Sequence, residues 1–326
     1  MIRNTQVLFI LFMECLFMST MLAVLAGWQD GTMTSTAFGS AVLTASDTAT
    51  EPASSPAVVL TIAGSEATGG AGAQADLKTF QELGVFGIAN LTCIVSFDPK
   101  DNWNHRFVPV EQQVIADQLE ATTAAYGAAS GAPAVLDTVK IGMLGSPATI
   151  STVAAALAAG QFANVVLDPV LICKGQEPGH ALDTDQALKS HILPLATFVT
   201  PNHFEAESLS GLEITDVESL KAAAVRIHEL SGAAVLAKGG VRLEGPDAVD
   251  VYYDGETLEV LSAPKVGEVA VSGAGCSLAA AVTAELAKGA TPLAAARTAK
   301  AFVTAGIRNR VASGAPFDAV WQGGPR

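Results

Sequence analysis

The sequence predicts an α/β fold of three layers (α/β/α), with helices on both faces of a central, mostly parallel sheet. From Ala57 onward, short apolar runs rich in Val, Ile and Leu alternate with longer Ala-rich amphipathic stretches. Strands that alternate with helices are joined by right-handed crossovers, which make the strands parallel and cover both faces of the sheet. Glycines and polar residues gather where the apolar runs end. In such sheets, ligands bind at the carboxyl ends of the strands.

The individual elements follow from these runs. Apolar β-branched runs predict strands, and Ala/Leu-rich stretches with helical spacing predict helices. The expected strands are Val58–Ala63, Leu91–Ser96, Val139–Met143, Val165–Val170, Phe198–Thr200, Ala234–Lys238 and Val249–Tyr253. The expected helices are Ala71–Leu83, Glu111–Ala125, Thr149–Leu157, Asp183–His191, Val217–Leu230, Cys276–Lys288 and Leu293–Arg308. We expect the Ala/Gly/Ser-rich stretch Ala121–Ala134 to be a surface insertion.

The chain divides into three expected segments. Residues 57–312 form one α/β domain, and residues 313–326 form a C-terminal tail. Residues 1–56 hold an almost wholly apolar stretch, Val7–Ala26, followed by a Thr/Ser/Ala/Pro-rich linker. The apolar stretch resembles a signal peptide or a single membrane span. The alternative, which we favour, is that translation begins at Met33 and that the protein is cytoplasmic.

Composition excludes several classes of protein. The net charge of −14 argues against a nucleic-acid partner, because no basic patch is available to neutralise phosphates in number. The negative charge does not argue against ATP as a ligand, since backbone N–H groups, a few lysines and a metal hold ATP locally. The four cysteines show no Cys-x-x-Cys or Cys/His clustering, which argues against structural zinc and a disulfide framework.

The run Val271–Cys276 leads into an Ala/Leu-rich helix and predicts an anion site. Glycines permit a tight turn, and a helix N-terminus offers unpaired N–H groups with a partial positive charge. Cys276 lies in the first turn, where we expect the helix dipole to lower the thiol pKa from about 8.5. An anion site that contains a potential base suits phosphoryl transfer. The alternative is an ordinary strand-to-helix turn in which Cys276 is a small buried hydrophobe.

Polar residues at other strand ends predict the rest of a nucleotide site. Asp168 and Glu205 follow neighbouring strands and supply hard oxygen ligands suited to Mg²⁺ that carries ATP phosphates. Lys238 ends a further strand and places an ammonium group near a phosphate. Alone, Asp168 would be read as a cap or turn residue and Lys238 as a solvated side chain. The glycine-rich loop from Gly64 to Gly72 contacts a ligand but lacks the Gly-Lys-Ser/Thr ending of a Walker A loop.

The span from about Ala57 to Arg308 resembles the ribokinase-like vitamin kinases, the branch that holds hydroxymethylpyrimidine (phosphate) kinases and pyridoxal/pyridoxine kinases. Seven ordered motifs carry the resemblance, which makes it highly specific. They are Ala63-Gly64-Ser65, Gly69-Gly70-Ala71-Gly72-x-Gln74-Ala75-Asp76-Leu77-Lys78-Thr79, Lys140-Ile141-Gly142-Met143-Leu144, Asp168-Pro169-Val170, Thr200-Pro201-Asn202-x-x-Glu205, Lys238-Gly239-Gly240 and Gly273-Ala274-Gly275-Cys276.

The resemblance implies a ribokinase-like α/β/α domain, ATP as co-substrate, Mg²⁺ as cofactor and a homodimer. It gives Cys276 the place of the aspartate base of many ribokinase relatives, with the amides of Gly273, Ala274 and Gly275 holding transition-state charge. The remaining implied roles are nucleotide binding by Asn202, Lys238 and Gly239, magnesium binding by Asp168 and Glu205, and vitamin binding by Ser65, Gly72, Asp76, Phe97, Met143 and Cys173.

The choice of vitamin rests on few positions. Hydroxymethylpyrimidine kinases typically carry a Gln that reads the substrate amine, whereas the matching residue here is Phe97. The stretches Trp103-Asn104-His105 and Asp254-Gly255-Glu256-Thr257 look like the pyridoxal-kinase subgroup, as does Cys173. The Cys173 thiol either adds reversibly to the aldehyde of pyridoxal or is an ordinary loop cysteine. We therefore expect ATP-dependent phosphorylation of the 5′-hydroxymethyl group of pyridoxal, pyridoxine and pyridoxamine, with hydroxymethylpyrimidine (phosphate) kinase as the alternative.

Three positions depart from the family pattern. Ser272 replaces a histidine, Glu66 replaces an aspartate, and Ala73 replaces a larger aliphatic residue. With the apolar N-terminus, the first two departures support a third hypothesis, a non-catalytic, membrane-tethered vitamin-binding protein. The intact magnesium site and base speak against it, because a binding protein needs neither.

Overall fold

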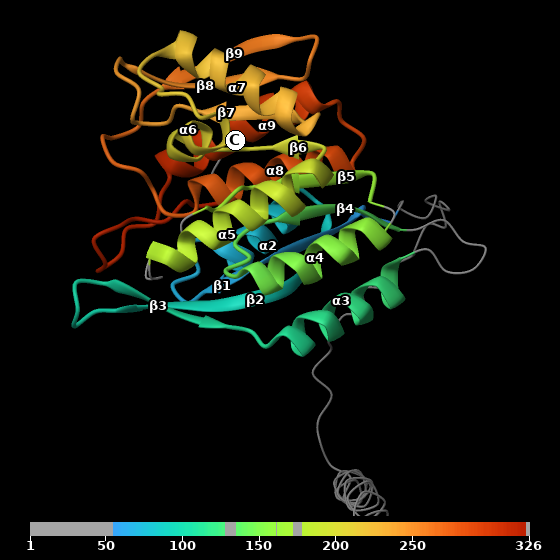
Figure 1. Cartoon of the computed structure of the whole chain (residues 1–326). Helices are drawn as coiled ribbons and strands as arrows, with labels where there is room; N and C mark the ends of the chain where they lie inside the picture. The colour runs from blue at the N-terminus through green and yellow to red at the C-terminus, as the bar shows by residue number, and fades with distance from the viewer. Residues whose placement is uncertain (1–54, 128–134, 161, 172–177, 324–326) are drawn as a thin grey trace, which may run out of the picture. The chain divides into compact units, whose positions relative to one another are not determined.

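A sheet of nine strands runs through the part of the chain that the computed structural model describes, residues 55–127, 135–160, 162–171 and 178–323 (Figure 1). The strand order is β3-β2-β1-β4-β5-β6-β7-β8-β9. Strands β2, β1, β4, β5, β6 and β7 run parallel, while β3 at one edge and β8–β9 at the other pair antiparallel. Their bounds are β1 Val58–Glu66, β2 Phe86–Asp98, β3 Asn104–Pro109, β4 Leu136–Ile141, β5 Asn164–Leu167, β6 Phe198–Val199, β7 Ala234–Lys238, β8 Asp247–Tyr253 and β9 Leu258–Pro264.

Helices cover both faces of this sheet. Residues of α3, α4, α5, α6 and α7 share one apolar core with the sheet, and residues of α2, α8 and α9 share the other. The bounds are α2 Gly72–Glu82, α3 Gln112–Tyr126, α4 Pro147–Ala159, α5 Pro178–His191, α6 His203–Ser210, α7 Val217–Ser231, α8 Ala274–Ala287 and α9 Pro292–Arg308, with a short 3-10 helix at Leu193–Leu195. The predicted three-layer fold is confirmed.

The two cores explain why most positions of the central strands are apolar. Leu60 and Ile62 of β1 contribute to one core, whereas Val59 between them contributes to the other. Successive side chains of a strand point to opposite faces, so a strand covered on both sides needs apolar residues on both faces.

Each expected strand and helix is present, with ends that differ by a few residues, but two strands, one α-helix and the short 3-10 helix of the described residues escaped prediction. The edge strands β3 and β9 carry polar residues, and α6 is short and starts directly after Asn202. The expectation of a surface insertion at Ala121–Ala134 is wrong for Ala121–Tyr126, which continue helix α3. Residues 128–134 lie outside the described part.

The C-terminal residues pack back onto the domain. Val311 and Ala319 form an antiparallel bridge, and Ala319 also pairs with Ser272. No helix in the described residues is both long enough and apolar enough to cross a membrane. The stretch Val7–Ala26 and the linker lie outside the described residues.

Candidate active site

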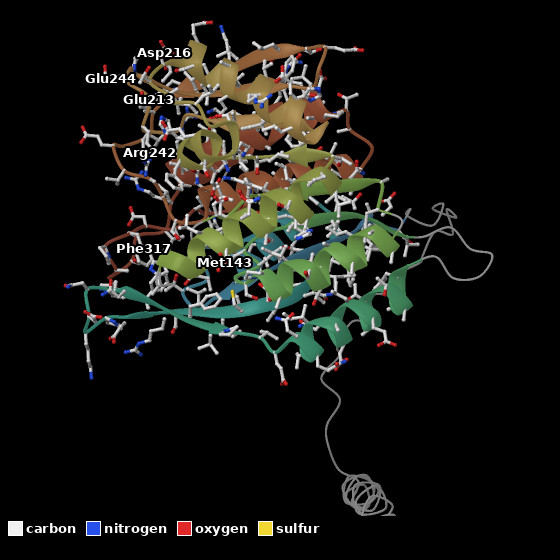
Figure 2. All side chains as sticks on the ribbon, in the orientation of Figure 1. Met143, Glu213, Asp216, Arg242, Glu244 and Phe317 are labelled. Carbon is white, nitrogen blue, oxygen red and sulfur yellow. The ribbon has the colours of Figure 1, made fainter. Side chains whose placement is uncertain are left out.

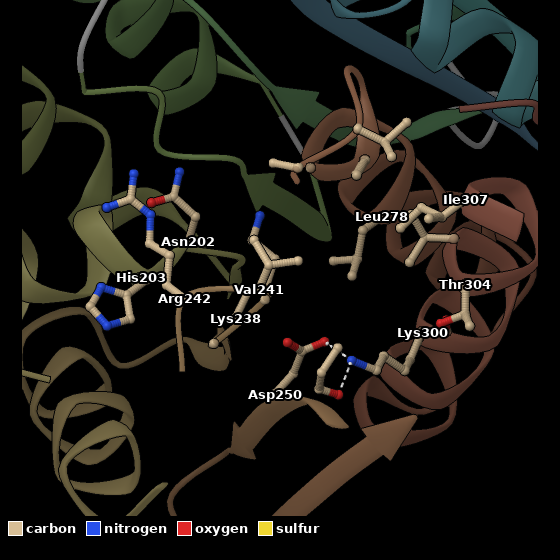
Figure 3. A pocket seen from close by; sticks show the side chains of 18 of the residues that line it. Asn202, His203, Lys238, Val241, Arg242, Asp250, Leu278, Lys300, Thr304 and Ile307 are labelled. Atoms are coloured by element: carbon tan, nitrogen blue, oxygen red, sulfur yellow. Dashed lines mark hydrogen bonds and ion pairs between the residues drawn. The ribbon is translucent and has the colours of Figure 1, made fainter. Parts of the chain in front are cut away.

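A cavity of about 660 Å³ lies at the carboxyl ends of β5, β6 and β7, beside the N-terminus of α8 (Figure 3). Its wall includes every residue that the sequence predicted for nucleotide, metal and catalytic roles. These are Asp168, Asn202, Glu205, Lys238, Gly239, Gly273, Ala274, Gly275 and Cys276. Residues separated by more than a hundred positions in the chain are therefore brought to one site.

The N-terminus of α8 forms one end of this cavity. Gly273 is its N-cap with φ +79°, and a Cβ atom there would overlap the carbonyl oxygen of Gly70. Only glycine fits both the backbone angle and this close approach. The first amides of a helix lack intrahelical acceptors, and here those of Gly275 and Cys276 are available to an anion. The amide of Ala274 already donates to the carbonyl of Val271, at 3.3 Å.

A charged pair lies against this first turn. Lys238 Nζ is 3.4 Å from Asp168 Oδ1, and both groups are largely buried. A Cβ atom at Gly275 would stand 3.5 Å from Lys238 Nζ and 4.0 Å from Asp168 Oδ1. The Asp168 side chain thus faces an ammonium group beside the predicted anion site rather than capping a turn.

Asn202 and Glu205 form a capping box at the start of α6. The side chain of Asn202 accepts the N–H of Glu205, and Glu205 Oε2 accepts the N–H of Asn202 at 2.7 Å. The pKa of Glu205 is raised to about 8, chiefly by burial and also by the charge of Asp168, while Lys238 opposes the change. Glu205 therefore has a structural role as well as a place in the cavity wall.

The carboxylates fit a cation that arrives with a nucleotide. Among the described residues, no group of three or more His, Cys, Asp and Glu side chains could cage a metal by itself. Magnesium in nucleotide enzymes is usually held by one or two carboxylates together with phosphates and waters. Asp168 and Glu205 repel each other's charge, which a cation between them would relieve.

The expected lowering of the Cys276 pKa is wrong. Burial raises the pKa of this thiol to about 12; Lys140 opposes the change, whereas the carboxylates of Asp168 and Asp76 add to it. The thiol reaches the cavity wall but is surrounded closely by protein. Loss of hydration outweighs the helix dipole and the hydrogen bond from the backbone of Gly72.

The described residues among those expected at the vitamin do not line this cavity. Ser65 and Gly72 pair across the glycine-rich loop, and Gly72 has φ +61° with no space for a Cβ atom against Gly64. Because Gly72 also hydrogen-bonds Cys276, the loop connects the two sides of the site.

Glu66 organises this loop. Its carboxylate accepts the N–H and hydroxyl of Thr68 at 2.6 and 2.8 Å, and the N–H groups of Gly70 and Ala71 at 3.0 and 3.1 Å. The departure from aspartate is thus compatible with an ordered loop.

Phe97 and Met143 lie toward the β2–β3 end of the sheet. The Phe97 ring packs against the rings of His105, Phe317 and Trp103, with centroids 4.7, 5.0 and 6.5 Å away. Figure 2 shows Met143 and Phe317 nearer this end of the sheet than Arg242, which lines the cavity. Cys173 lies outside the described residues.

The structure does not support a direct contact between Asp76 and a substrate. Asp76 is 0% exposed, and its Oδ2 accepts from Lys140 Nζ at 2.9 Å and from Thr61 Oγ1 at 2.6 Å. Lys140 is equally buried. Within the described residues, Asp76 Oδ1 has no hydrogen-bond partner. The Asp76 carboxylate therefore has a structural role, as the partner of Lys140 and Thr61.

One cavity feature escaped prediction. Lys300 on α9 donates to Asp250 Oδ2 and to the carbonyl of Ala248, both at 2.8 Å, at the cavity end shown in Figure 3. Leu278, Thr304 and Ile307 form the neighbouring wall. The sequence could have indicated Lys300, because it is the one charged residue on the buried, otherwise apolar face of α9.

The sequence matches the family described as phosphomethylpyrimidine kinase over residues 66–321. The chain belongs to this family. It is similar to the pyridoxine kinase of Bacillus subtilis (strain 168), with 46% identity over 76% of this chain and 89% of that protein.

Solved structures of the family share the fold. The pyridoxal kinase from Staphylococcus aureus, in complex with AMP-PCP and pyridoxal, is 39% identical, with a TM-score of 0.74 over 83% of this chain and 94% of that one. A phosphomethylpyrimidine kinase from Clostridium difficile 630 is 31% identical, with a TM-score of 0.62 over 76% of this chain and 97% of that one.

Proposed function

We propose that this protein is an ATP-dependent pyridoxal kinase, which transfers the γ-phosphoryl group of ATP to the 5′-hydroxymethyl group of pyridoxal, pyridoxine and pyridoxamine. One observation carries the proposal: the first turn of α8 presents amides and Cys276 to a cavity that also holds Lys238 and two carboxylates. The similarity to proteins named pyridoxine kinase and pyridoxal kinase supports the choice of vitamin.

Each side chain has a role in this reaction. The amides of Gly273, Gly275 and Cys276 stabilise the negative charge that develops on the transferred group, whereas that of Ala274 is engaged by Val271. Asn202, Gly239 and Lys238 hold the phosphates of the nucleotide. Cys276 accepts the proton of the vitamin hydroxyl.

A thiol with a pKa of about 12 is mostly protonated at neutral pH, so only a small thiolate fraction acts as the base. In phosphoryl transfer the bond to the leaving oxygen is largely broken before the new bond forms, so the proton of the vitamin hydroxyl leaves late in the reaction. We therefore expect kcat to rise with pH.

Asp168 and Glu205 would hold Mg²⁺, which neutralises charge on the ATP phosphates when it is bound. The capping oxygen of Glu205 is engaged by Asn202, which leaves its other carboxylate oxygen for this task. Ionisation of Glu205 is a condition for binding, because a neutral carboxyl is a poor ligand.

On the vitamin side, we propose that Ser65, Gly72, Phe97 and Met143 surround the ring, and that Cys173 contacts the aldehyde. If the thiol adds to the carbonyl, Cys173→Ala will slow pyridoxal turnover and leave pyridoxine, which has no carbonyl, nearly unchanged. Equal losses of turnover on pyridoxal and pyridoxine would show that Cys173 does not bond to the substrate and has only a structural role.

Turnover on pyridoxal and on hydroxymethylpyrimidine, measured with the purified full chain, tests the proposed function. We expect a higher kcat/KM for pyridoxal. A preference for hydroxymethylpyrimidine would assign the protein to thiamine synthesis, and no ATP turnover on either would favour the non-catalytic hypothesis. Phe97→Gln is the informative variant, because it restores the amide typical of the pyrimidine kinases.

The proposal includes a cytoplasmic homodimer without a nucleic-acid partner. The described Cys93 and Cys276 are both free thiols, which suits a reducing compartment that also supplies ATP. Sedimentation of the purified protein tests the dimer.

A further inference from the structure

The C-terminal segment forms backbone hydrogen bonds with Ser272, the residue before the anion-binding turn. The N–H of Ser272 donates to the carbonyl of Asp318 at 2.9 Å, and the carbonyl of Ser272 accepts the N–H of Val320 at 3.0 Å. Gly273 follows directly. We call residues 311–322 the C-terminal strap.

A second contact lies on the other side of the same turn. Gln322 is 4% exposed, and its Nε2 donates to the hydroxyl of Ser277 at 3.0 Å. Ser277 follows Cys276 and is fully buried. A buried amide and a buried hydroxyl both need partners, so this hydrogen bond fixes the strap against the first turn of α8.

The strap is itself well anchored. Val311 and Ala319 exchange two backbone hydrogen bonds, of 2.8 and 3.0 Å. The N–H of Trp321 donates to the carbonyl of Gly306 on α9, where a Cβ atom would stand only 2.7 Å from Val320. Because the strap is fixed to α9 by these contacts, it can hold the turn at Ser272 in place.

The other end of the strap reaches the vitamin side. The ring of Phe317 packs on Phe97 and Trp103, at 5.0 and 6.0 Å between centroids. Trp103 has φ +59°, a strained angle for a bulky residue that the packed rings stabilise. The strap thus bridges the aromatic group around Phe97 and the anion-binding turn.

We propose that the strap is part of the catalytic apparatus and that Gln322 is a positioning residue for the anion-binding turn. The inference rests on the proposed phosphoryl transfer at that turn. The amides and the Cys276 thiol lie between the two points that the strap holds, Ser272 and Ser277. A misplacement of about 1 Å in a catalytic group costs on the order of 10²-fold in rate.

The test compares Gln322→Ala, Ser277→Ala and the double variant. Each single variant should lower kcat by roughly 10- to 100-fold, while ADP, which lacks the γ-phosphate, should bind within about twofold of the original affinity. The double variant should lose no more than either single one, because both remove the same hydrogen bond. Ser277→Ala places a strong helix former in α8, so it tests the pair even if Gln322→Ala folds poorly.

The control is Glu229→Ala on α7. It removes an exposed ion pair with Arg226, away from the strap and the cavity, so kcat should not change. Unchanged kcat in both single variants, losses that multiply in the double variant, or ADP binding that falls in parallel with kcat would each overturn the proposal. The comparison uses whichever vitamin the wild type phosphorylates, so it stands apart from the choice of substrate.

Discussion

The proposed nucleotide half and the proposed vitamin half of the active site are built in different ways. The nucleotide half is a cavity at three adjacent strand ends, closed by the first turn of α8. The vitamin half combines the glycine-rich loop, the β2–β3 hairpin, Met143 and the C-terminal strap, which come from distant parts of the chain. The first half depends on backbone geometry and the second on how side chains pack.

This difference determines how sharply each half responds to substitution. Backbone amides and tight glycine turns have no substitute, so a small change in the nucleotide half should lower the rate strongly. Rings that pack around Phe97 can repack, so changes in the vitamin half should alter substrate choice more than rate.

A large loss of rate is expected for substitution of Gly273. Gly273→Ala places a Cβ atom against the carbonyl of Gly70 at φ +79°, which displaces the anion-binding turn. We expect kcat to fall by roughly 10²–10³-fold, the range for loss of an oxyanion donor. Gly289→Ala is the matched control, because it also has positive φ, +88°, but open space around it. Equal activity in the two variants would contradict the backbone-built anion site.

The buried ion pair of Asp76 and Lys140 should make a large contribution to the free energy of unfolding. Asp76→Asn leaves the Lys140 ammonium buried without its counter-charge, and we expect unfolding free energy to fall by about 3–5 kcal/mol. Chemical denaturation measures this. The double variant Asp76→Asn with Lys140→Met should recover much of the loss, whereas Glu259→Gln, in an exposed pair with Arg297, should show no clear change. A mild effect of Asp76→Asn would mean that water reaches Lys140.

Glu205 should give a smaller, pH-dependent effect. Its pKa is about 8 in the folded protein against an ordinary value of 4.5. Below pH 4.5 the carboxyl is protonated in both the folded and the unfolded chain. As pH rises from 4.5 to 8 the unfolded chain loses this proton first, so stability falls across that window.

Glu205→Gln keeps an oxygen for the cap but cannot ionise. The Tm of this variant should therefore depend less on pH between 5 and 8.5, and should exceed that of the wild type at the upper end without ligand. Addition of Mg²⁺ with ATP should raise the wild-type Tm more than the variant's. Parallel pH curves for the two proteins would contradict the raised pKa.

The same division separates what the sequence could predict from what it could not. The α8 turn, Asp168, Glu205 and Lys238 were predictable, because short motifs specify strand ends and helix starts. The burial of Asp76 was not predictable, since it depends on Lys140, 64 residues away in the chain. The raised pKa of Cys276 and the contacts of the strap likewise arise only from tertiary packing.

The most direct measurement is kcat for Cys276→Ala and Cys276→Asp, with saturating ATP and pyridoxal, between pH 6 and 9. We expect Cys276→Ala to lose roughly 10²–10⁴ in kcat, the usual contribution of a positioned base, while ADP affinity barely changes. Cys276→Asp should retain some activity with a flat pH profile, whereas the wild-type rate should rise with pH toward the thiol pKa of about 12. Undiminished kcat in Cys276→Ala would remove the base from the mechanism and leave the anion-binding turn as the catalytic element.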